Sequence, residues 1–207
     1  KKRKIYFEQL KNCLKTNSIN SNQSLFWHNK ILSTHSSTKE RLEIYPILYK
    51  KLFQLTLKPN SILDISAGLN PFSFPYMQLK NVKYIATELT LEDCKLIKDY
   101  FNLKKIQGKV LQLDLFSFEN FPKADITFLF KTFNTLEKNS FEIAEKILKN
   151  LKSKFVIVSF PIKTISNKKM NFPFYPGFER LLQRLNFSYK KLLLKNELFF
   201  IISLQQH

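Results

Sequence analysis

ILDISAGLNP, at residues 62–71, joins a short apolar run to a turn that contains Gly68, one of only three glycines in the chain. A short apolar run is typical of a buried strand, and small residues at its end let the backbone approach a ligand closely. We therefore expect a strand over Ser61–Ile65 followed by a ligand-binding turn, with Asp64 and Asn70 as polar contacts. An ordinary α/β turn has the same pattern, so this segment alone leaves both interpretations open.

Downstream of this turn, strand patterns alternate with helical ones. We expect strands at Lys83–Thr87, Val110–Leu113, Ile126–Phe130, Phe155–Phe160, Ser188–Leu194 and Leu198–Leu204, and helices at Leu91–Phe101, Ser140–Leu151 and Gly177–Leu185. Helices between strands imply crossovers and a mostly parallel sheet. The last two strands are so close in sequence that they should form an antiparallel hairpin. This α/β architecture, a seven-stranded, mostly parallel sheet with a C-terminal antiparallel hairpin, resembles that of class I (Rossmann-like) methyltransferases.

The first 57 residues have a helical pattern instead. Apolar residues recur at helical spacing between Ile44 and Leu55, and Pro46 marks either a helix start or a kink. The segment Thr16–Ser24 is rich in Asn and Ser and is expected to be a loop. We therefore divide the chain into an N-terminal helical region, residues 1–57, and an α/β domain, residues 58–207.

The charge balance is strongly basic, with 34 Lys and Arg against 16 Asp and Glu, which gives a net charge of +18. An AT-rich genome would raise Lys, but it would also raise Glu, so codon bias does not explain the excess. We expect a polyanionic partner, nucleic acid first and an anionic membrane surface second. No apolar run approaches the roughly 20 residues that cross a bilayer, and no apolar signal core follows the basic start, so we expect a cytoplasmic protein without a membrane segment. Two isolated cysteines and three scattered histidines predict no structural metal.

The residues that end each expected strand fit S-adenosylmethionine as a ligand. Ligands of open α/β sheets lie beyond the carboxyl ends of the strands. Glu88 ends the second strand, where a carboxylate can accept hydrogen bonds from ribose hydroxyls. Asp114 and Leu115 end the third strand and offer a carboxylate and an apolar contact to adenine.

Four blocks of sequence carry a family resemblance. They are His35-Ser36-Ser37-Thr38-Lys39-Glu40-Arg41-Leu42, Gly68-Leu69-Asn70-Pro71, Phe130-Lys131 and Ser159-Phe160-Pro161. In this order they resemble blocks of the aminoglycoside-resistance 16S ribosomal RNA guanine-N7 methyltransferases, over about Leu32–Leu204. The resemblance implies a class I methyltransferase fold, S-adenosylmethionine as cofactor, and transfer to guanine N7 in the decoding region of small-subunit ribosomal RNA, free or within the 30S subunit. We further expect a monomer.

The resemblance also implies roles for individual residues. Arg41 would pair with the methionine carboxylate of the cofactor, and Glu88 would bind the ribose. The full cofactor-binding set is His35, Thr38, Arg41, Asp64, Ser66, Ala67, Gly68, Asn70, Pro71, Glu88, Leu89, Asp114, Leu115 and Phe130. Phe130, Lys131, Ser159, Phe160 and Pro161 would border the transfer site. The structural alternative for Arg41 is a surface ion pair with Glu40 or Glu43.

Three departures separate this chain from the family pattern. Glu88 stands where the family usually has Asp, and the residues after Pro161 differ from the family's basic, glycine-containing continuation. The N-terminal region of about sixty residues, which serves RNA docking in the family, is shorter here. These differences leave the target nucleotide open.

Guanine N7 carries a free lone pair, so we expect catalysis by positioning and name no general base. Phe130, Phe160 or Tyr175 would support a base that has left its stack, although in a chain with 21 phenylalanines such rings more often belong to the core. The residues expected to contact the RNA backbone are Lys163, Lys168, Lys169, Lys1, Lys2, Arg3, Lys4, Lys11, Lys15 and Lys30. Two other functions remain open: a noncatalytic RNA-binding protein, and a methyltransferase for another RNA, a protein or a small molecule.

Overall fold

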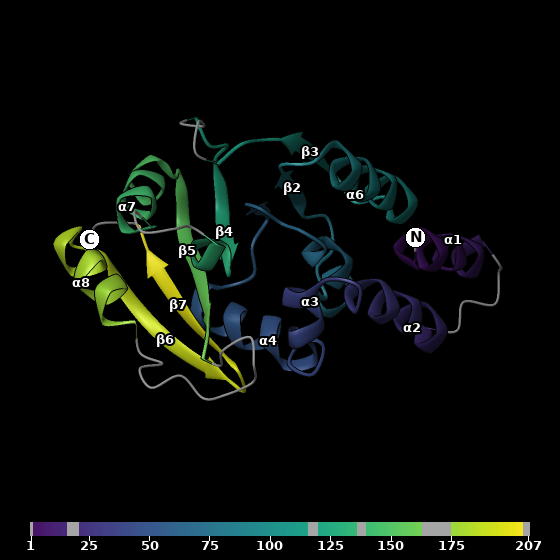
Figure 1. Cartoon of the computed structure of the whole chain (residues 1–207), viewed down its shortest axis with the longest axis horizontal. Coiled ribbons are helices and arrows are strands. Elements are labelled where there is room, and N and C mark those ends of the chain that lie inside the picture. The colour runs from purple at the N-terminus through teal and green to yellow at the C-terminus, as the bar shows by residue number, and fades with distance from the viewer. Residues whose placement is uncertain (1, 16–20, 116–119, 136–139, 163–174, 205–207) are drawn as a thin grey trace.

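The computed structural model describes residues 2–15, 21–115, 120–135, 140–162 and 175–204, and its core is one seven-stranded sheet (Figure 1). The strands are β1 (Ser61–Asp64), β2 (Lys83–Glu88), β3 (Gly108–Gln112), β4 (Ala124–Phe130), β5 (Ser153–Pro161), β6 (Ser188–Leu194) and β7 (Glu197–Ser203). Their spatial order is β3-β2-β1-β4-β5-β7-β6. Strands β1 to β5 pair in parallel, whereas β7 pairs antiparallel with both β5 and β6. The predicted fold class is confirmed, with strand ends shifted by one or two residues.

The helices are α1 (Lys2–Lys15), α2 (Ser21–Leu32), α3 (Ser36–Arg41), α4 (Tyr45–Thr56), α5 (Phe74–Met77), α6 (Leu91–Lys104), α7 (Ser140–Asn150) and α8 (Pro176–Arg184), with 3₁₀ turns η1 (Asn70–Ser73) and η2 (Thr132–Thr135). Pro46 lies in the first turn of α4, so it marks a helix start rather than a kink.

The predicted loop Thr16–Ser24 is wrong for its last four residues, because α2 begins at Ser21; residues 16–20 lie outside the described part of the chain. Ser24 is buried, and its carbonyl oxygen lies 2.7 Å from Nδ1 of His28 one turn later. Tertiary packing therefore overrides the local preference of Ser and Asn for loops.

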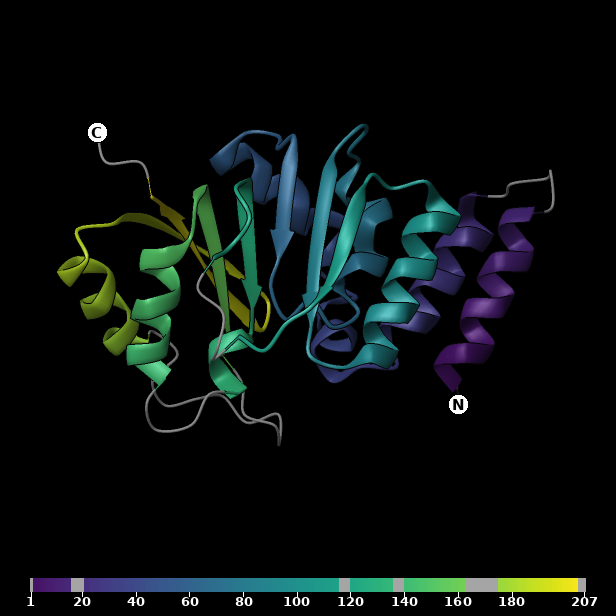
Figure 2. The ribbon, with the colours of Figure 1, turned by 90° about the horizontal axis from the view of Figure 1, so that it is seen from above.

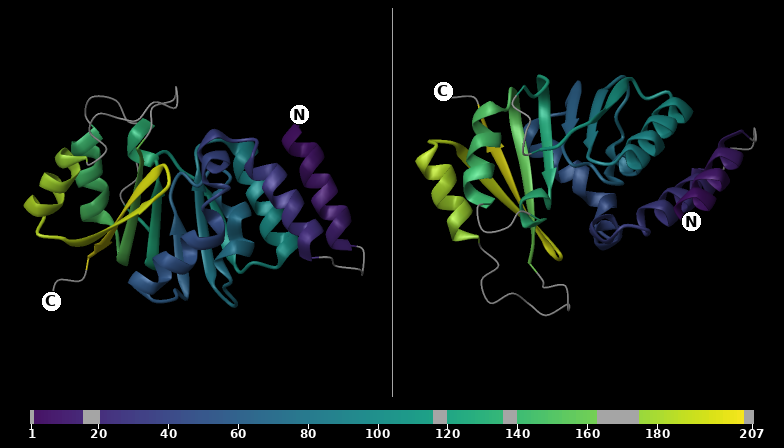
Figure 3. Two further views of the ribbon diagram at one scale, coloured as in Figure 1. Left: turned by 90° about the horizontal axis from the view of Figure 1, so that it is seen from below. Right: turned by 45° about the horizontal axis from the view of Figure 1, so that its top comes forward.

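Two apolar clusters cover the two faces of the sheet. Helices α1, α2, α4 and α6 contribute to the cluster that contains Phe128, and helices α7 and α8 contribute to the cluster that contains the adjacent Leu129. Figures 2 and 3 show α7 and α8 at one end of the molecule and α1 and α2 at the other. Successive side chains of β4 thus point to opposite, fully covered faces, as expected for a mostly parallel sheet.

The N-terminal helices share their core with the sheet. The ring of Tyr49 in α4 lies 6.1 Å from that of Phe128 in β4, and Phe7 of α1 packs edge-on against Phe72 of η1. Residues 1–57 are therefore packed onto the α/β domain. None of the helices in the described ranges is long and apolar enough to span a membrane.

Candidate active site

The turn after β1 is braced by buried polar side chains. Oδ2 of Asp64 accepts hydrogen bonds from Nδ2 of Asn70 at 2.9 Å and from the hydroxyl of Tyr84 at 2.7 Å. Oδ1 of Asn70 accepts from the hydroxyls of Tyr45 and Tyr49 at 3.2 and 3.1 Å. Burial raises the pKa of Asp64 to about 6. Asp64 and Asn70 thus bind one another and hold the turn in shape; their direct contact with a cofactor stays a prediction.

Gly68 lies in this turn and is partly exposed. Its φ is +53°, a left-handed conformation that favours glycine, and its N–H donates to Oε1 of Glu88 at 2.5 Å. A Cβ placed on Gly68 would lie 3.7 Å from Cε1 of His35 and 4.0 Å from Oε1 of Glu88. The end of β2, the glycine turn and the residue before α3 therefore meet at one place. His35 is half-buried there, and this burial lowers its pKa.

The segment before and within α3 fixes Arg41. The hydroxyl of Thr38 donates to the carbonyl oxygen of Leu32 at 2.6 Å, which ties α3 to the end of α2. Arg41 is only 1% exposed, and its Nε lies 2.8 and 2.9 Å from the two carboxylate oxygens of Glu197. Its guanidinium carbon lies 4.9 Å from the centre of the Phe130 ring. The alternative of a surface ion pair for Arg41 is therefore wrong.

Glu197 connects Arg41 to the ends of three strands. Its Oε1 accepts from the hydroxyl of Ser159 at 2.5 Å, and its Oε2 lies 3.7 Å from Nζ of Lys131. Lys131 also forms an ion pair with Glu40, and its backbone N–H donates to the Ser159 hydroxyl at 3.0 Å. Although burial opposes the charge of Arg41, Glu197 raises the pKa of its guanidinium above the ordinary value. Sequence reasoning assigned Glu197 to the hairpin turn and missed this role.

Arg41 retains an unused donor. Its Nη2 is buried and has no hydrogen-bond partner among the described residues. An unsatisfied guanidinium N–H is costly to bury, and it fits an anionic group such as a carboxylate. Nη2 of Arg41 is therefore a buried donor that none of the described residues satisfies.

The remaining predicted cofactor residues lie along the same edge of the sheet. The backbone N–H of Leu113 donates to the carbonyl oxygen of Glu88 at 2.9 Å, which places the exposed Asp114 and the buried Leu115 beside the end of β2. Leu89 is 61% exposed at that end. The other members of the set surround Gly68: Ser66 and Ala67 contact β2 through their backbone N–H groups, and Pro71 is buried in η1.

Two of the three predicted base-supporting rings are in the core. Phe130 is covered by Arg41, and Phe160 is 4% exposed and stacks on Tyr175 at 4.2 Å. The hydroxyl of Tyr175 donates to the carbonyl oxygen of Pro161 at 2.5 Å. Neither Phe130 nor Phe160 presents an open face, so of the three only Tyr175 is partly exposed.

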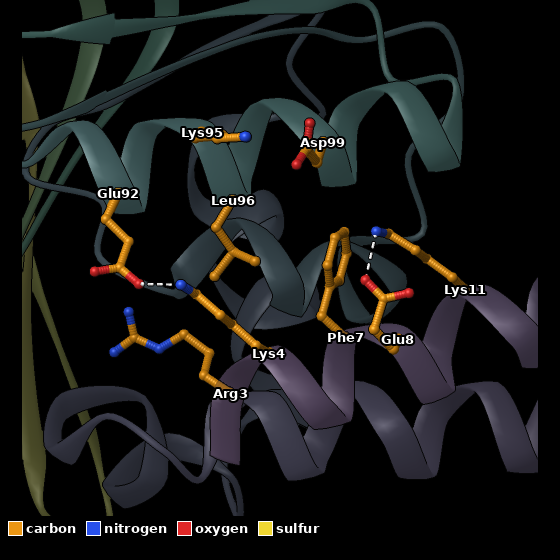
Figure 4. A pocket seen from close by; sticks show the side chains of 9 residues that line it. All are labelled: Arg3, Lys4, Phe7, Glu8, Lys11, Glu92, Lys95, Leu96 and Asp99. Carbon is orange, nitrogen blue, oxygen red and sulfur yellow. Dashed lines mark hydrogen bonds and ion pairs between the residues drawn. The ribbon is translucent and has the colours of Figure 1, made fainter. Parts of the chain in front are cut away.

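The predicted RNA-contacting cations fall into two groups. Lys1, Lys163, Lys168 and Lys169 lie outside the described residues. Three of the others, Arg3, Lys4 and Lys11, line a pocket of about 220 Å³ between α1 and α6, where Lys4 pairs with Glu92 and Lys11 with Glu8 (Figure 4). Arg3 forms an ion pair with Asp93. Nζ of Lys30 lies 5.1 Å from the centre of the Phe26 ring. Lys2 and Lys15 are exposed. Asp93, Glu92 and Glu8 partly neutralise the charges of Arg3, Lys4 and Lys11.

Known proteins with the same fold include 16S rRNA methylases. The structure of ArmA matches with a TM-score of 0.71 at 23% identity, covering 95% of this chain and 97% of that one. The structure of RmtF, in complex with S-adenosyl-L-homocysteine, matches with a TM-score of 0.72 at 19% identity, covering 97% and 75%. At these identities the likeness establishes the fold alone.

Sequence relatives establish the family. A 16S rRNA (guanine(1405)-N(7))-methyltransferase from Proteus mirabilis is 35% identical over 181 residues, or 84% of this chain and 64% of the relative. The enzyme of the same name from Micromonospora rosea is 25% identical over 179 residues, or 85% and 65%. The chain thus spans just under two thirds of the length of these relatives. The profile of the family described as ribosomal RNA methyltransferase (FmrO) matches residues 27–201. The resemblance read from the sequence is confirmed, and the chain belongs to the FmrO family of ribosomal RNA methyltransferases.

Proposed function

We propose that this protein transfers the methyl group of S-adenosylmethionine to N7 of a guanine in the decoding region of 16S ribosomal RNA, within the 30S subunit or free. The observation that carries the proposal is the meeting of the Gly68 turn with Glu88 and with His35, the residue before the helix that carries the buried Arg41, at the carboxyl edge of the sheet. The names of the sequence relatives support the same activity.

The residues present fit the cofactor. The unpartnered Nη2 of Arg41 suits the methionine carboxylate, and the partly exposed Gly68, which has no side chain, would let the adjoining atoms approach its backbone. Glu88 accepts one hydrogen bond at each oxygen, from Gly68 and Leu89, and a carboxylate retains capacity for ribose hydroxyls. Leu115 would lie against adenine. S-adenosylmethionine supplies an electrophilic methyl group when bound.

The protein's part in the reaction is positioning. Guanine N7 attacks through a lone pair and releases no proton, so no side chain is required as a general base. Lys131 borders the proposed transfer site, and its side chain is held by Glu40 and Glu197. Its backbone has a φ of +57°, and its N–H donates to the hydroxyl of Ser159 at 3.0 Å. We infer that this rigid edge aligns the acceptor with the methyl group.

Basic residues would dock the RNA. The net charge of +18 favours a polyanion, and the N-terminal region 1–57 together with Lys163, Lys168 and Lys169 is our proposed docking surface. Lys2, Lys15 and Lys30 are better candidates within α1 and α2 than Arg3, Lys4 and Lys11, because acidic side chains pair with the latter. A protein that acts on ribosomal RNA would work in the cytoplasm, and we expect it to act as a monomer.

The decisive experiment incubates 30S subunits, free 16S rRNA and a mixture of small metabolites with labelled S-adenosylmethionine. Borohydride and aniline cleavage then maps any N7-methylguanine. We expect label in the 30S or free 16S rRNA at a decoding-region guanine, and none with Arg41→Met. Arg180→Met changes an exposed arginine of α8 and serves as the control that retains activity. Label in metabolites alone, or an absence of both label and S-adenosylhomocysteine binding, would instead support the other two functions considered above.

A further inference from the structure

We propose that Glu197 is a positioning residue for the cofactor, which orients the Arg41 guanidinium so that Nη2 faces the amino-acid end of the bound molecule. This inference rests on the proposed function. It adds a residue from the C-terminal hairpin to a site otherwise built from α3 and the strands β1 to β4.

The first support is the geometry of the pair. Nε of Arg41 lies within 2.9 Å of both oxygens of Glu197, while Nη2 has no partner in the described part of the chain. Glu197 therefore holds the guanidinium at Nε and leaves a different nitrogen to donate. Because the guanidinium is planar, fixing Nε and stacking the group over Phe130 fixes the direction of Nη2 as well.

The second support is that Glu197 is itself immobilised. It begins β7 opposite Pro161 of β5, and its carboxylate contacts the hydroxyl of Ser159 and Nζ of Lys131. The side chain is 3% exposed. A carboxylate anchored at the ends of β4 and β5 can transmit the rigidity of the sheet to a side chain on the short helix α3.

The third support is energetic. Burying an ion pair costs desolvation free energy that the attraction between the charges often does no more than offset, so such a pair is weak evidence for stability. The side chains of Arg41 and Glu197 are 1% and 3% exposed. The burial of this pair is better explained by the orientation that Glu197 imposes on the guanidinium than by a gain in stability. By contrast, Glu43 reaches the same hairpin through an ion pair with Lys195 and is 69% exposed, as expected of a pair without such a role.

The test measures binding of two ligands to the full chain by isothermal titration calorimetry. S-adenosylhomocysteine carries the amino-acid carboxylate, and 5′-methylthioadenosine lacks it. We expect Glu197→Gln to weaken S-adenosylhomocysteine binding about tenfold or more, because a charge-assisted hydrogen bond is misdirected, and to leave 5′-methylthioadenosine binding unchanged. The matched control Glu43→Gln is expected to leave both affinities unchanged.

Circular dichroism melting first establishes that the variant is folded. If Glu197→Gln does not fold, Glu197→Asp keeps the charge but withdraws the carboxylate, and it should show the same selective loss to a smaller degree. A folded variant that binds both ligands like the wild type, or loses both equally, overturns the inference. A wild-type protein that binds no S-adenosylhomocysteine overturns the proposed function instead, so the two failures are distinct.

Discussion

Replacing Asp64 by Asn is expected to remove a pH dependence of stability that this buried carboxyl imposes. Asp64 is 1% exposed, and burial raises its pKa from an ordinary value of 3.8 to about 6. A group with a raised pKa binds its proton more tightly in the folded than in the unfolded protein. Its contribution to stability is therefore present below pH 4 and is lost as the pH rises towards 6 and above.

The size of the effect follows from the two pKa values. A change from 3.8 to about 6 corresponds to about 3 kcal/mol of unfolding free energy, lost between roughly pH 4 and pH 7. Asn is close to isosteric and can accept from Tyr84 and Asn70 through its carbonyl oxygen. The free energy of unfolding of Asp64→Asn, relative to that of the wild type, should therefore rise by about this amount across the same pH range.

Urea unfolding at pH 4, 5, 6 and 7, followed by the fluorescence of Trp27, the only tryptophan, gives the required free energies. Asp125→Asn is the matched control, because a hydrogen bond from Lys154 lowers the pKa of Asp125. Its contribution is lost only as the pH falls below about 4, so over pH 4 to 7 the free energy of unfolding of the control should stay nearly constant relative to that of the wild type. If the free energies of unfolding of Asp64→Asn and the wild type differ by the same amount at every pH from 4 to 7, the reasoning is refuted.

Three further substitutions test the glycine turn, the register of β3 and the start of α6. Gly68→Ala should lower stability by about 1 kcal/mol, since its φ is +53°. It should also weaken S-adenosylhomocysteine binding, because the added methyl group would stand 4.0 Å from Oε1 of Glu88, the proposed ribose ligand; calorimetry that finds wild-type affinity would contradict a cofactor site at this turn. Gly108→Ala should lower the melting temperature by several degrees, because its Cβ would overlap the carbonyl oxygen of Tyr84, and an unchanged melting temperature would count against the register of β3. Thr90→Ala removes the N-cap of α6 and should cost about 1 kcal/mol in urea unfolding, whereas Thr90→Ser should restore most of it.

The sheet could be predicted from the sequence because most of its strands are apolar runs bounded by polar turns. The starts of β3, β4 and β5 were each predicted two residues too late, and the error at β3 has a clear physical cause. We expected the third strand at Val110–Leu113, whereas β3 begins at Gly108. This strand is at the edge of the sheet, so Gly108 and Lys109 join through backbone hydrogen bonds without needing apolar side chains. Pattern recognition detects burial, and an edge strand extends beyond its buried part.

The site was predictable only in part. Local blocks pointed to Arg41, Gly68 and Glu88, and the structure brings the regions that carry them together. The partner of Arg41 was not predictable, because Glu197 lies 156 residues further along the chain and stands beside an apolar strand, where it reads as a turn residue. The tyrosines that brace the turn were missed for a related reason. In a helical pattern Tyr45 and Tyr49 count as core residues, and their hydroxyl contacts depend on a fold that no local pattern encodes.

The shortness of α3 explains why its geometry depends on residues elsewhere. A helix of six residues is too short to be stable through its own hydrogen bonds, and the sequence SSTKER contains no apolar residue to pack it. Its attachments are instead polar: Thr38 to Leu32, Glu40 to Lys131, and Arg41 to Glu197. The position of Arg41 is therefore set by β4, β5 and β7 rather than by helix propensity. The C-terminal hairpin lies outside the four sequence blocks that carry the family resemblance. Substitutions in it should nevertheless disturb the position of Arg41, and with it the cofactor end of the site, more readily than they disturb the sheet.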